Sequence, residues 1–341
     1  MVDFSALGAL GFGAAAIGNL YHATTEANAA ETVRTAWTAG IRYFDTAPHY
    51  GFGLSEKRLG LTLPQIDPDE TSILSTKVGR RLDPVPPATD LGTLRQGFVT
   101  PEPVESVFDY SYDSIMRSYE ASRQRLRRER IDILYAHDIG RFTHGDDHPR
   151  LFRDFMNGGY RAMRELRDSG AVGAIGLGVN EYEVCEEVLA ERDLDVVLLA
   201  GRYTLLEQDS LATFLPLCER RDVKIVLGGP YNSGILAKGV RKGGDPHYNY
   251  QSAPQTIIDR VGAIEDICAE HGAPMAAAAL QFPLAHPQVV SVIPGMASPH
   301  QVAEAVRLMS IDIPPLLWSD LKDRGLIRAD APVPRAAPAT L

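Results

Sequence analysis

Short apolar runs alternate with helix-like segments along most of the chain, and this alternation limits the possible folds more than any other feature. Eight of these runs have strand character: Leu10–Phe12, Ile41–Phe44, Ile73–Ser75, Ile131–Ala136, Val172–Gly178, Asp195–Ala200, Lys224–Leu227 and Val289–Ile293. Such alternation is typical of parallel strands joined by crossover helices. Eight repeats in 341 residues predict an α/β fold, a closed (β/α)8 TIM barrel, for which about 250 residues are usual. We expect one domain over residues 1–341.

Two segments are expected to form long loops, near residues 83–112 and 238–254. The first contains five prolines and is predicted to lack regular structure, whereas the second is rich in glycine, tyrosine and polar residues. Both follow strand ends, where the loops of a barrel border its active site. They are expected to form substrate walls or a cofactor cover, with plain solvent loops as an equal alternative.

The charge of the chain argues against several classes of partner. A formal net charge of -10 opposes binding to nucleic acid or anionic lipid. No apolar run approaches the ~20 residues of a membrane helix, and no basic residue before Arg34 marks a signal peptide. The cysteines at 185, 218 and 268 are far apart, so buried thiols are expected instead of zinc ligands. We expect a cytoplasmic protein without a nucleic-acid or membrane partner.

Four chemically reactive residues lie where predicted strands end. Asp45 and Tyr50 follow the second strand. Lys77 follows the third strand and His137 the fourth. Strand ends on one face of a barrel carry its chemistry. A nearby ammonium favours an ionised phenol, whose unperturbed pKa is ~10, so we expect Lys77 to lower the pKa of Tyr50 and to make it an acid or base near neutral pH.

Two further motifs have simpler interpretations. The segment Gly11–Ala16 has the spacing of a dinucleotide fingerprint, but the region from Glu31 has a helical pattern where the fingerprint requires a second strand. We therefore interpret it as a glycine-rich first barrel strand. The other motif contains His144, Asp146, Asp147 and His148. These residues occupy an irregular stretch without a framework, so we predict solvated side chains and no metal site.

Several motifs together resemble the aldo-keto reductase superfamily. They are Asp45–Gly51, Ser75–Gly79, Ile131–Asp138 and Val292–Gly295. The resemblance covers nearly the whole chain and implies a (β/α)8 barrel, a nicotinamide cofactor, direct hydride transfer and a catalytic tetrad of Asp45, Tyr50, Lys77 and His137. Further motifs are similar to the bacterial aldose 1-dehydrogenase branch, which includes L-fucose (D-threo-aldose) dehydrogenases and pyridoxal 4-dehydrogenases. These are Phe108–Ser111, Gly176–Glu181, Arg202–Leu206 and Gly228–Leu236.

The resemblance also implies which residues bind the cofactor. They are Asn180, Gly228, Gly229, Pro230, Tyr231, Gly234, Leu236, Pro294, Gly295, Ser298 and Gln301. Asn180 would hold the carboxamide, and Tyr231 would replace a stacking tyrosine that aligns with Gly228. Members that favour NADPH tend to carry Lys and Arg where Gly295 and Gln301 stand, and such cations bind a 2′-phosphate. Their absence here favours NAD, with NADP as the less favoured choice.

The branch implies oxidation of the anomeric hydroxyl of an aldose of the L-fucose or D-threo type to its lactone. Substrate contacts are expected at Tyr21, His49, Phe52 and Asp138. Pyridoxal suits the same chemistry, because its internal hemiacetal also presents an anomeric hydroxyl and would yield 4-pyridoxolactone. A third interpretation is a cofactor-sensing, non-enzymatic binding subunit, since fold alone does not establish function.

Overall fold

An eight-stranded sheet forms the centre of the computed structural model, which describes residues 2–249 and 251–334. In sheet order, the strands are β1 (Phe12–Gly13), β2 (Tyr43–Asp45), β3 (Ile73–Val78), β8 (Ile131–His137), β9 (Val172–Val179), β10 (Val196–Ala200), β11 (Lys224–Gly228) and β14 (Val289–Ile293). Neighbouring strands pair in parallel. Each of the eight predicted strands is present, with ends shifted by a few residues.

The sheet closes into a barrel where its first and last strands meet. The amide of Gly11 donates to the carbonyl oxygen of Val292 at 2.9 Å. A Cβ at position 11 would lie 2.8 Å from the side chains of Ile293 and Tyr43, so the approach requires glycine. The prediction of a (β/α)8 TIM barrel is confirmed, as is the interpretation of the glycine-rich segment as its first strand.

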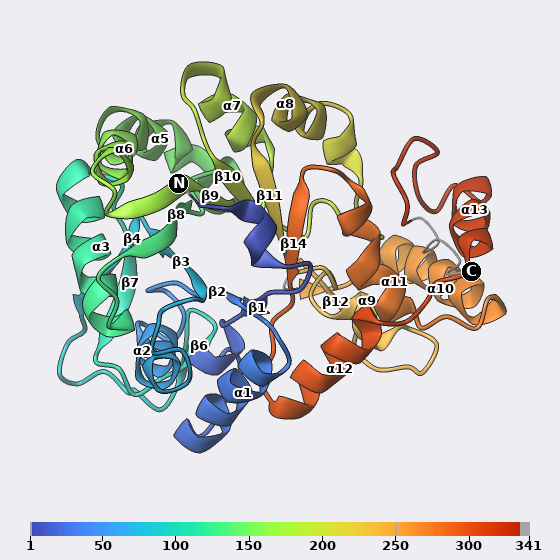
Figure 1. Ribbon diagram of the computed structural model, residues 1–341, viewed down its shortest axis with the longest axis horizontal. Coiled ribbons are helices and arrows are strands. Elements are labelled where there is room, and N and C mark those ends of the chain that lie inside the picture. The colour runs from blue at the N-terminus through green and yellow to red at the C-terminus, as the bar shows by residue number, and fades with distance from the viewer. Residues whose placement is uncertain (1, 250, 335–341) are drawn as a thin grey trace.

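The α-helices lie outside the ring of strands (Figure 1). They are α1 (Glu26–Thr38), α2 (Leu54–Ile66), α3 (Tyr112–Leu126), α4 (Arg141–His144), α5 (His148–Asp154), α6 (Tyr160–Asp168), α7 (Glu183–Glu191), α8 (Phe214–Arg221), α9 (Ile235–Lys238), α10 (Gln255–Glu270), α11 (Met275–Gln281), α12 (Pro299–Met309) and α13 (Pro315–Asp323). Over the described part of the chain, no helix is long and apolar enough to cross a membrane.

Two groups of apolar side chains hold these layers together. The larger group lies among the helices and against the outer face of the sheet, and it includes fully buried residues such as Val33 and Ile264. A separate cluster includes Tyr43, Tyr135 and Val226. Apart from Leu7, which precedes β1, its members come from alternate strand positions and fill the barrel interior, as in other barrels with this number of strands.

The stretch 83–112 is not the unstructured loop that its prolines suggested. β4 (Arg80–Pro84) pairs antiparallel with β7 (Val104–Phe108), and β5 (Leu94–Arg95) pairs with β6 (Phe98–Val99). The prolines fall at a strand end or in the connections, where the missing amide donor breaks no central strand pair. They limit the lengths of the strands without preventing the hairpins.

The stretch 238–254 also contains a small hairpin, formed by β12 (His247–Tyr248) and β13 (Gln251–Ser252). The hydroxyl of Tyr248 donates to Glu207. The side chain of Arg202 donates to Asn249 Oδ1 at 3.0 Å. These bonds attach the hairpin to the segment that follows β10.

Candidate active site

The carboxyl ends of three neighbouring strands bring the four reactive residues together. Asp45 ends β2, Lys77 lies in β3 and His137 ends β8; these strands are adjacent in the sheet. Tyr50 lies in the turn after β2, with its ring centroid 4.9 Å from Lys77 Nζ. The rings of Tyr50 and His137 have centroids 6.0 Å apart and planes at 87°. A phenol, an ammonium, a carboxylate and an imidazole therefore share one centre.

A buried ion pair holds Lys77 at the base of this centre. Its Nζ donates to Asp45 Oδ2 at 2.7 Å and to the carbonyl oxygen of Thr46 at 2.8 Å. The two charged side chains are 2% and 3% exposed, and Ser75 Oγ donates to the other Asp45 oxygen at 2.6 Å. Burial raises the pKa of Asp45, whereas Lys77 and the hydrogen bonds oppose the shift. Because removing one partner would leave the other charge buried and unpaired, each side chain fixes the other.

The environment of Tyr50 keeps its phenol neutral. Burial, with the carboxylates of Asp45 and Asp138, raises the pKa of Tyr50 well above its ordinary value, and Arg80 offsets only part of this shift. The prediction that Lys77 lowers the pKa is wrong, because its ammonium is already paired with Asp45 and burial of the phenol dominates. A phenol with a raised pKa is suited to donate a proton.

The two histidines beside Tyr50 are also neutral. Burial lowers the pKa of His137 well below its ordinary value, and the cations of Arg80 and Lys77 add to the shift. The same causes lower the pKa of His49. His137 Nε2 lies 3.4 Å from Asp138 Oδ2. A neutral imidazole can orient a substrate oxygen by hydrogen bonding without changing its own charge.

Tyr50, Lys77 and His137 open into a cavity of about 370 Å³. The expected substrate residues that line it are Tyr21, His49 and Asp138. Phe52 does not line it, since its ring is 1% exposed and packs against the guanidinium of Arg95, 4.9 Å from the ring centroid. The prediction of a substrate contact at Phe52 is wrong, because the left-handed backbone there, with φ 55°, belongs to a turn whose ring packs in the core.

One wall of the cavity is a network of polar side chains. Arg80 Nη1 donates to Asp138 Oδ2 at 3.0 Å, and Asn180 Nδ2 donates to Asp138 Oδ1 at 3.0 Å. Arg80 Nε donates to Ser106 Oγ at 3.0 Å, and this oxygen lies 3.1 Å from His49 Nδ1. The wall thus offers a cation, a carboxylate and an amide to a polar ligand.

Part of the cavity comes from the hairpins that were expected to be a loop. Gln96, Gly97 and Phe98 line it. The ring centroid of Phe98 lies 5.1 Å from that of His49 and 6.1 Å from that of Tyr50. These residues were not expected from the sequence, because the nearby prolines hide the weak strand signal of the phenylalanine and valine at positions 98 and 99.

Most of the residues expected to hold the cofactor follow β11 and β14, whereas Asn180 follows β9 and lines the cavity. Gly228 ends β11, and a Cβ at Gly295, just after β14, would have no atom within 4 Å. Ser298 caps α12 by accepting from the amide of Gln301 at 3.3 Å. Gln301 Oε1 in turn accepts from the amide of Ala297 at 2.6 Å. Strand ends without side chains beside a helix N-terminus fit the pyrophosphate of a dinucleotide.

Leu236 does not fit that group of residues. Its side chain is fully buried, and its amide donates to the carbonyl oxygen of Tyr231 at 3.2 Å. The short helix α9 turns the Leu236 side chain into the core, so its contact with a cofactor stays a prediction. Tyr231 is half-buried, and its burial, together with the Glu304 carboxylate, raises its pKa.

Comparison with known sequences identifies the family. A sequence model of the Aldo/keto reductase family matches residues 9–323. The chain belongs to this family. Pyridoxal 4-dehydrogenase of Microbacterium luteolum is 44% identical over 326 residues, with 94% of each chain covered. D-threo-aldose 1-dehydrogenase of Pseudomonas sp is 39% identical over 323 residues, with 94% of this chain and 95% of the relative covered. The chain is a nicotinamide-dependent oxidoreductase that acts on CH–OH groups.

Solved structures show the same fold at low sequence identity. The glycerol dehydrogenase of Gluconobacter oxydans superposes with a TM-score of 0.71 at 20% identity, covering 97% of this chain and 94% of its own. The holo form of an aldo-keto reductase from Bacillus halodurans gives a TM-score of 0.70 at 24% identity, with coverages of 94% and 92%. These similarities support the barrel architecture.

Proposed function

We propose that this aldo-keto reductase uses NAD to oxidise the anomeric hydroxyl of an aldose of the L-fucose or D-threo type to the lactone. The proposal depends mainly on one observation, the opening of the Tyr50 centre into a cavity with a polar wall at Arg80 and Asp138. A sugar presents several hydroxyls, and convergent donors and acceptors are what such a ligand requires. The similarity to D-threo-aldose 1-dehydrogenase supports the same chemistry.

Tyr50 is the group that exchanges a proton with the substrate. In oxidation, the anomeric hydroxyl gives its proton to the ionised phenol; in reduction, the neutral phenol gives it back. A nicotinamide cofactor, which residues at the carboxyl ends of β11 and β14 would hold, would supply the acceptor for a hydride from the anomeric carbon. Neutral His137 hydrogen-bonds the reacting oxygen and sets its angle, while the pair of Lys77 and Asp45 fixes the floor of the site. Because the pKa of Tyr50 is raised, oxidation depends on a minor ionised form.

Two features support NAD over NADP. Residues 294–301 contain no Lys or Arg. Further along α12, Glu304 accepts from Arg307 at 2.7 and 2.8 Å, so this nearby cation is already paired. A 2′-phosphate bound beside residues 294–307 would therefore find no unpaired Lys or Arg there, and charge-assisted hydrogen bonds to such a cation are what select NADP.

Pyridoxal is the second candidate substrate. Pyridoxal 4-dehydrogenase is a relative at 44% identity, and the pyridoxal hemiacetal offers the same reacting hydroxyl. Phe98 and Tyr21 line the cavity, and their rings are suited to pack against a pyridine. The product would be 4-pyridoxolactone.

Initial rates test both candidates. With NAD, we expect the highest kcat/KM for one of L-fucose, D-arabinose and L-galactose, at least about tenfold above that for pyridoxal, since the polar wall is matched to hydroxyls. Replacing NAD with NADP should lower kcat/KM at least about tenfold. If pyridoxal is oxidised and none of the three sugars is, pyridoxal replaces the aldose as the proposed substrate. No NADH formation with any of the four would refute it.

A further inference from the structure

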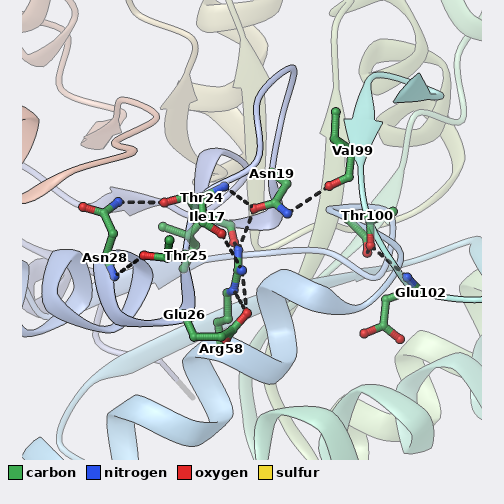
Figure 2. A network of polar contacts seen from close by, with 11 residues as sticks. Ile17, Asn19, Thr24, Thr25, Glu26, Asn28, Arg58, Val99, Thr100 and Glu102 are labelled. Carbon is green, nitrogen blue, oxygen red and sulfur yellow. Dashed lines mark hydrogen bonds and ion pairs between the residues drawn. The ribbon is translucent and has the colours of Figure 1, made fainter. Parts of the chain in front are cut away.

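Arg58 in α2 is a buried cation that binds the loop after β1. Its side chain is 5% exposed. Nη1 donates to the carbonyl oxygen of Ile17 at 2.6 Å and to Asn19 Oδ1 at 2.8 Å, and Nη2 donates to the carbonyl oxygen of Thr24 at 3.0 Å. Nε and Nη2 donate to Glu26 Oε1 at 3.0 and 2.6 Å. Figure 2 shows the guanidinium surrounded by acceptors from this one loop.

The loop that Arg58 holds forms part of the cavity wall. Asn19 Nδ2 donates to the carbonyl oxygen of Val99 at 2.9 Å (Figure 2), and the amide of Val99 donates back to Asn19 at 3.1 Å. The amide of Tyr21 donates to the carbonyl oxygen of Gly97 at 2.9 Å. Between these bonds, Leu20 and Phe98 pair as a β-bridge, and both line the cavity beside Tyr50.

A second branch runs from the same loop to the segment before α12. The amide of Thr24 donates to Asn19 Oδ1 at 3.0 Å. Asn28 Nδ2 contacts Thr24 Oγ1 at 2.7 Å and the carbonyl oxygen of Ala297 at 2.8 Å. Ala297 directly precedes Ser298, the cap of the helix that is proposed to meet the cofactor.

We propose that Arg58 is a positioning residue that sets the substrate wall and the cofactor segment together. It contacts neither ligand and acts through two asparagines, Asn19 on the wall and Asn28 on the segment before α12. This inference rests on the proposed function, because it takes the cavity as the substrate site and the start of α12 as part of the cofactor site.

The neutral acceptors of the loop, more than Glu26, give Arg58 this role. The Glu26 side chain is 68% exposed, and exposed ion pairs contribute little. The oxygens of Ile17, Asn19 and Thr24 accept from two different guanidinium nitrogens, a spread of donors that the single nitrogen of an ammonium cannot reproduce. Glu26→Gln should therefore leave both KM values within about twofold, whereas Arg58→Lys should restore only part of the wild-type behaviour.

A matched pair of variants separates positioning from general stability. Arg58→Met keeps the apolar stem and removes the donors. Arg128 is also 5% exposed, and it donates to Asp67 and Ser72 at 3.2 and 2.7 Å, at the amino end of β3 and away from the cavity. We expect Arg58→Met to raise the KM for aldose and for NAD at least about tenfold, because small displacements of positioning groups have large effects. Arg128→Met, compared at equal folded fraction, should change neither the KM for aldose nor the KM for NAD.

Two further variants divide the branches. Asn19 has φ 68°, so Asn19→Gly keeps the backbone and removes the side-chain amide, which bonds both Val99 and Thr24. It should raise the aldose KM more than the NAD KM, because Arg58 still donates to the carbonyl oxygen of Thr24 on the cofactor branch. Asn28→Ala should do the reverse. Equal effects of both variants on both KM values would overturn the division of roles, as would an Arg58→Met variant that behaves like Arg128→Met.

Hydrogen–deuterium exchange tests the inference without catalysis. In Arg58→Met, amides of residues 17–24 and 96–100 should exchange at least about tenfold faster than in the wild type, and Arg128→Met should leave them unchanged. Unchanged exchange in these segments would overturn the role of Arg58, whether or not an aldose is oxidised. If exchange in these segments rises in Arg58→Met but the wild-type protein oxidises none of the four substrates, the proposed function is refuted and the role of Arg58 is not. If Arg58→Met does not fold, Arg58→Lys and Asn19→Gly serve for the same comparison.

Discussion

Replacing Tyr50 with phenylalanine removes the proposed proton-transfer atom and little else. Among the residues that the structure describes, none forms a hydrogen bond with the Tyr50 hydroxyl. The ring would keep its neighbours, with centroids at 6.1 Å from Phe98 and 6.0 Å from His137. The free energy of unfolding should therefore change by no more than about 0.5 kcal/mol. Loss of a general acid or base lowers kcat about 100- to 10,000-fold, which is about 3–5 kcal/mol of transition-state stabilisation.

Three measurements on Tyr50→Phe check this reasoning. NADH formation by absorbance gives kcat, a fluorescence titration gives the affinity for NADH, and urea unfolding gives the stability. Tyr119→Phe is a matched control, because its hydroxyl donates to the carbonyl oxygen of Ala171 at 3.0 Å, far along α3 from the cavity. The control should lose about 1 kcal/mol of stability and keep its kcat, the opposite of the pattern expected at Tyr50.

The result that would refute the reasoning is a Tyr50→Phe variant that keeps more than about a tenth of the wild-type kcat. A kcat that falls only in proportion to a loss of folded protein would refute it equally. Weak NADH binding alone would not account for the expected loss at saturating cofactor, since the phenol oxygen is assigned to the proton transfer and to no cofactor contact.

The remaining predictions concern pH. Because burial and nearby carboxylates hold the pKa of Tyr50 well above its ordinary value, kcat/KM for oxidation should rise about tenfold per pH unit up to about pH 9, while reduction, which uses the neutral phenol, stays nearly flat; a flat oxidation profile would contradict the assignment. Burial raises the pKa of Asp67, but hydrogen bonds from Ser72 and Thr71 outweigh this effect and lower the pKa to about 2. The folded pKa lies below the unfolded one, so ionised Asp67 contributes about 2 kcal/mol above about pH 4 that is lost as the pH falls toward 2. Between about pH 3 and pH 6, the free energy of unfolding, measured in urea, should change less for Asp67→Asn than for the wild type. An equal change in the two proteins would rule out the contribution assigned to Asp67.

The sequence predicted the barrel and the convergence of its reactive residues for the same physical reason. Parallel strands buried on both faces appear as continuous apolar runs, so the first polar residues after each run mark one edge of the sheet. Asp45 and His137 lie at such ends in the structure, and Lys77 lies near one. Tyr50 could be placed with them because only a short turn separates it from β2.

What the sequence did not predict depends on packing in three dimensions. The pKa of Tyr50 is raised by burial that no local pattern reveals. The Phe52 ring enters the core because of a turn, and the cavity residues near Phe98 belong to hairpins whose prolines suggested disorder. The network around Arg58 joins segments from residues 17 to 297, and a contact of that range leaves no periodic signal in a single sequence.

The seam between β1 and β14 also has a consequence for the way the molecule folds. Closing it joins segments about 280 residues apart, which costs about 5 kcal/mol of chain entropy before any contact is gained. Non-local pairing of this kind slows folding. The strands that carry the tetrad leave the ribosome early, but the segment before α12 follows the final strand. The nascent chain therefore cannot acquire activity until that strand docks, and this docking is where a rate-limiting step should be sought.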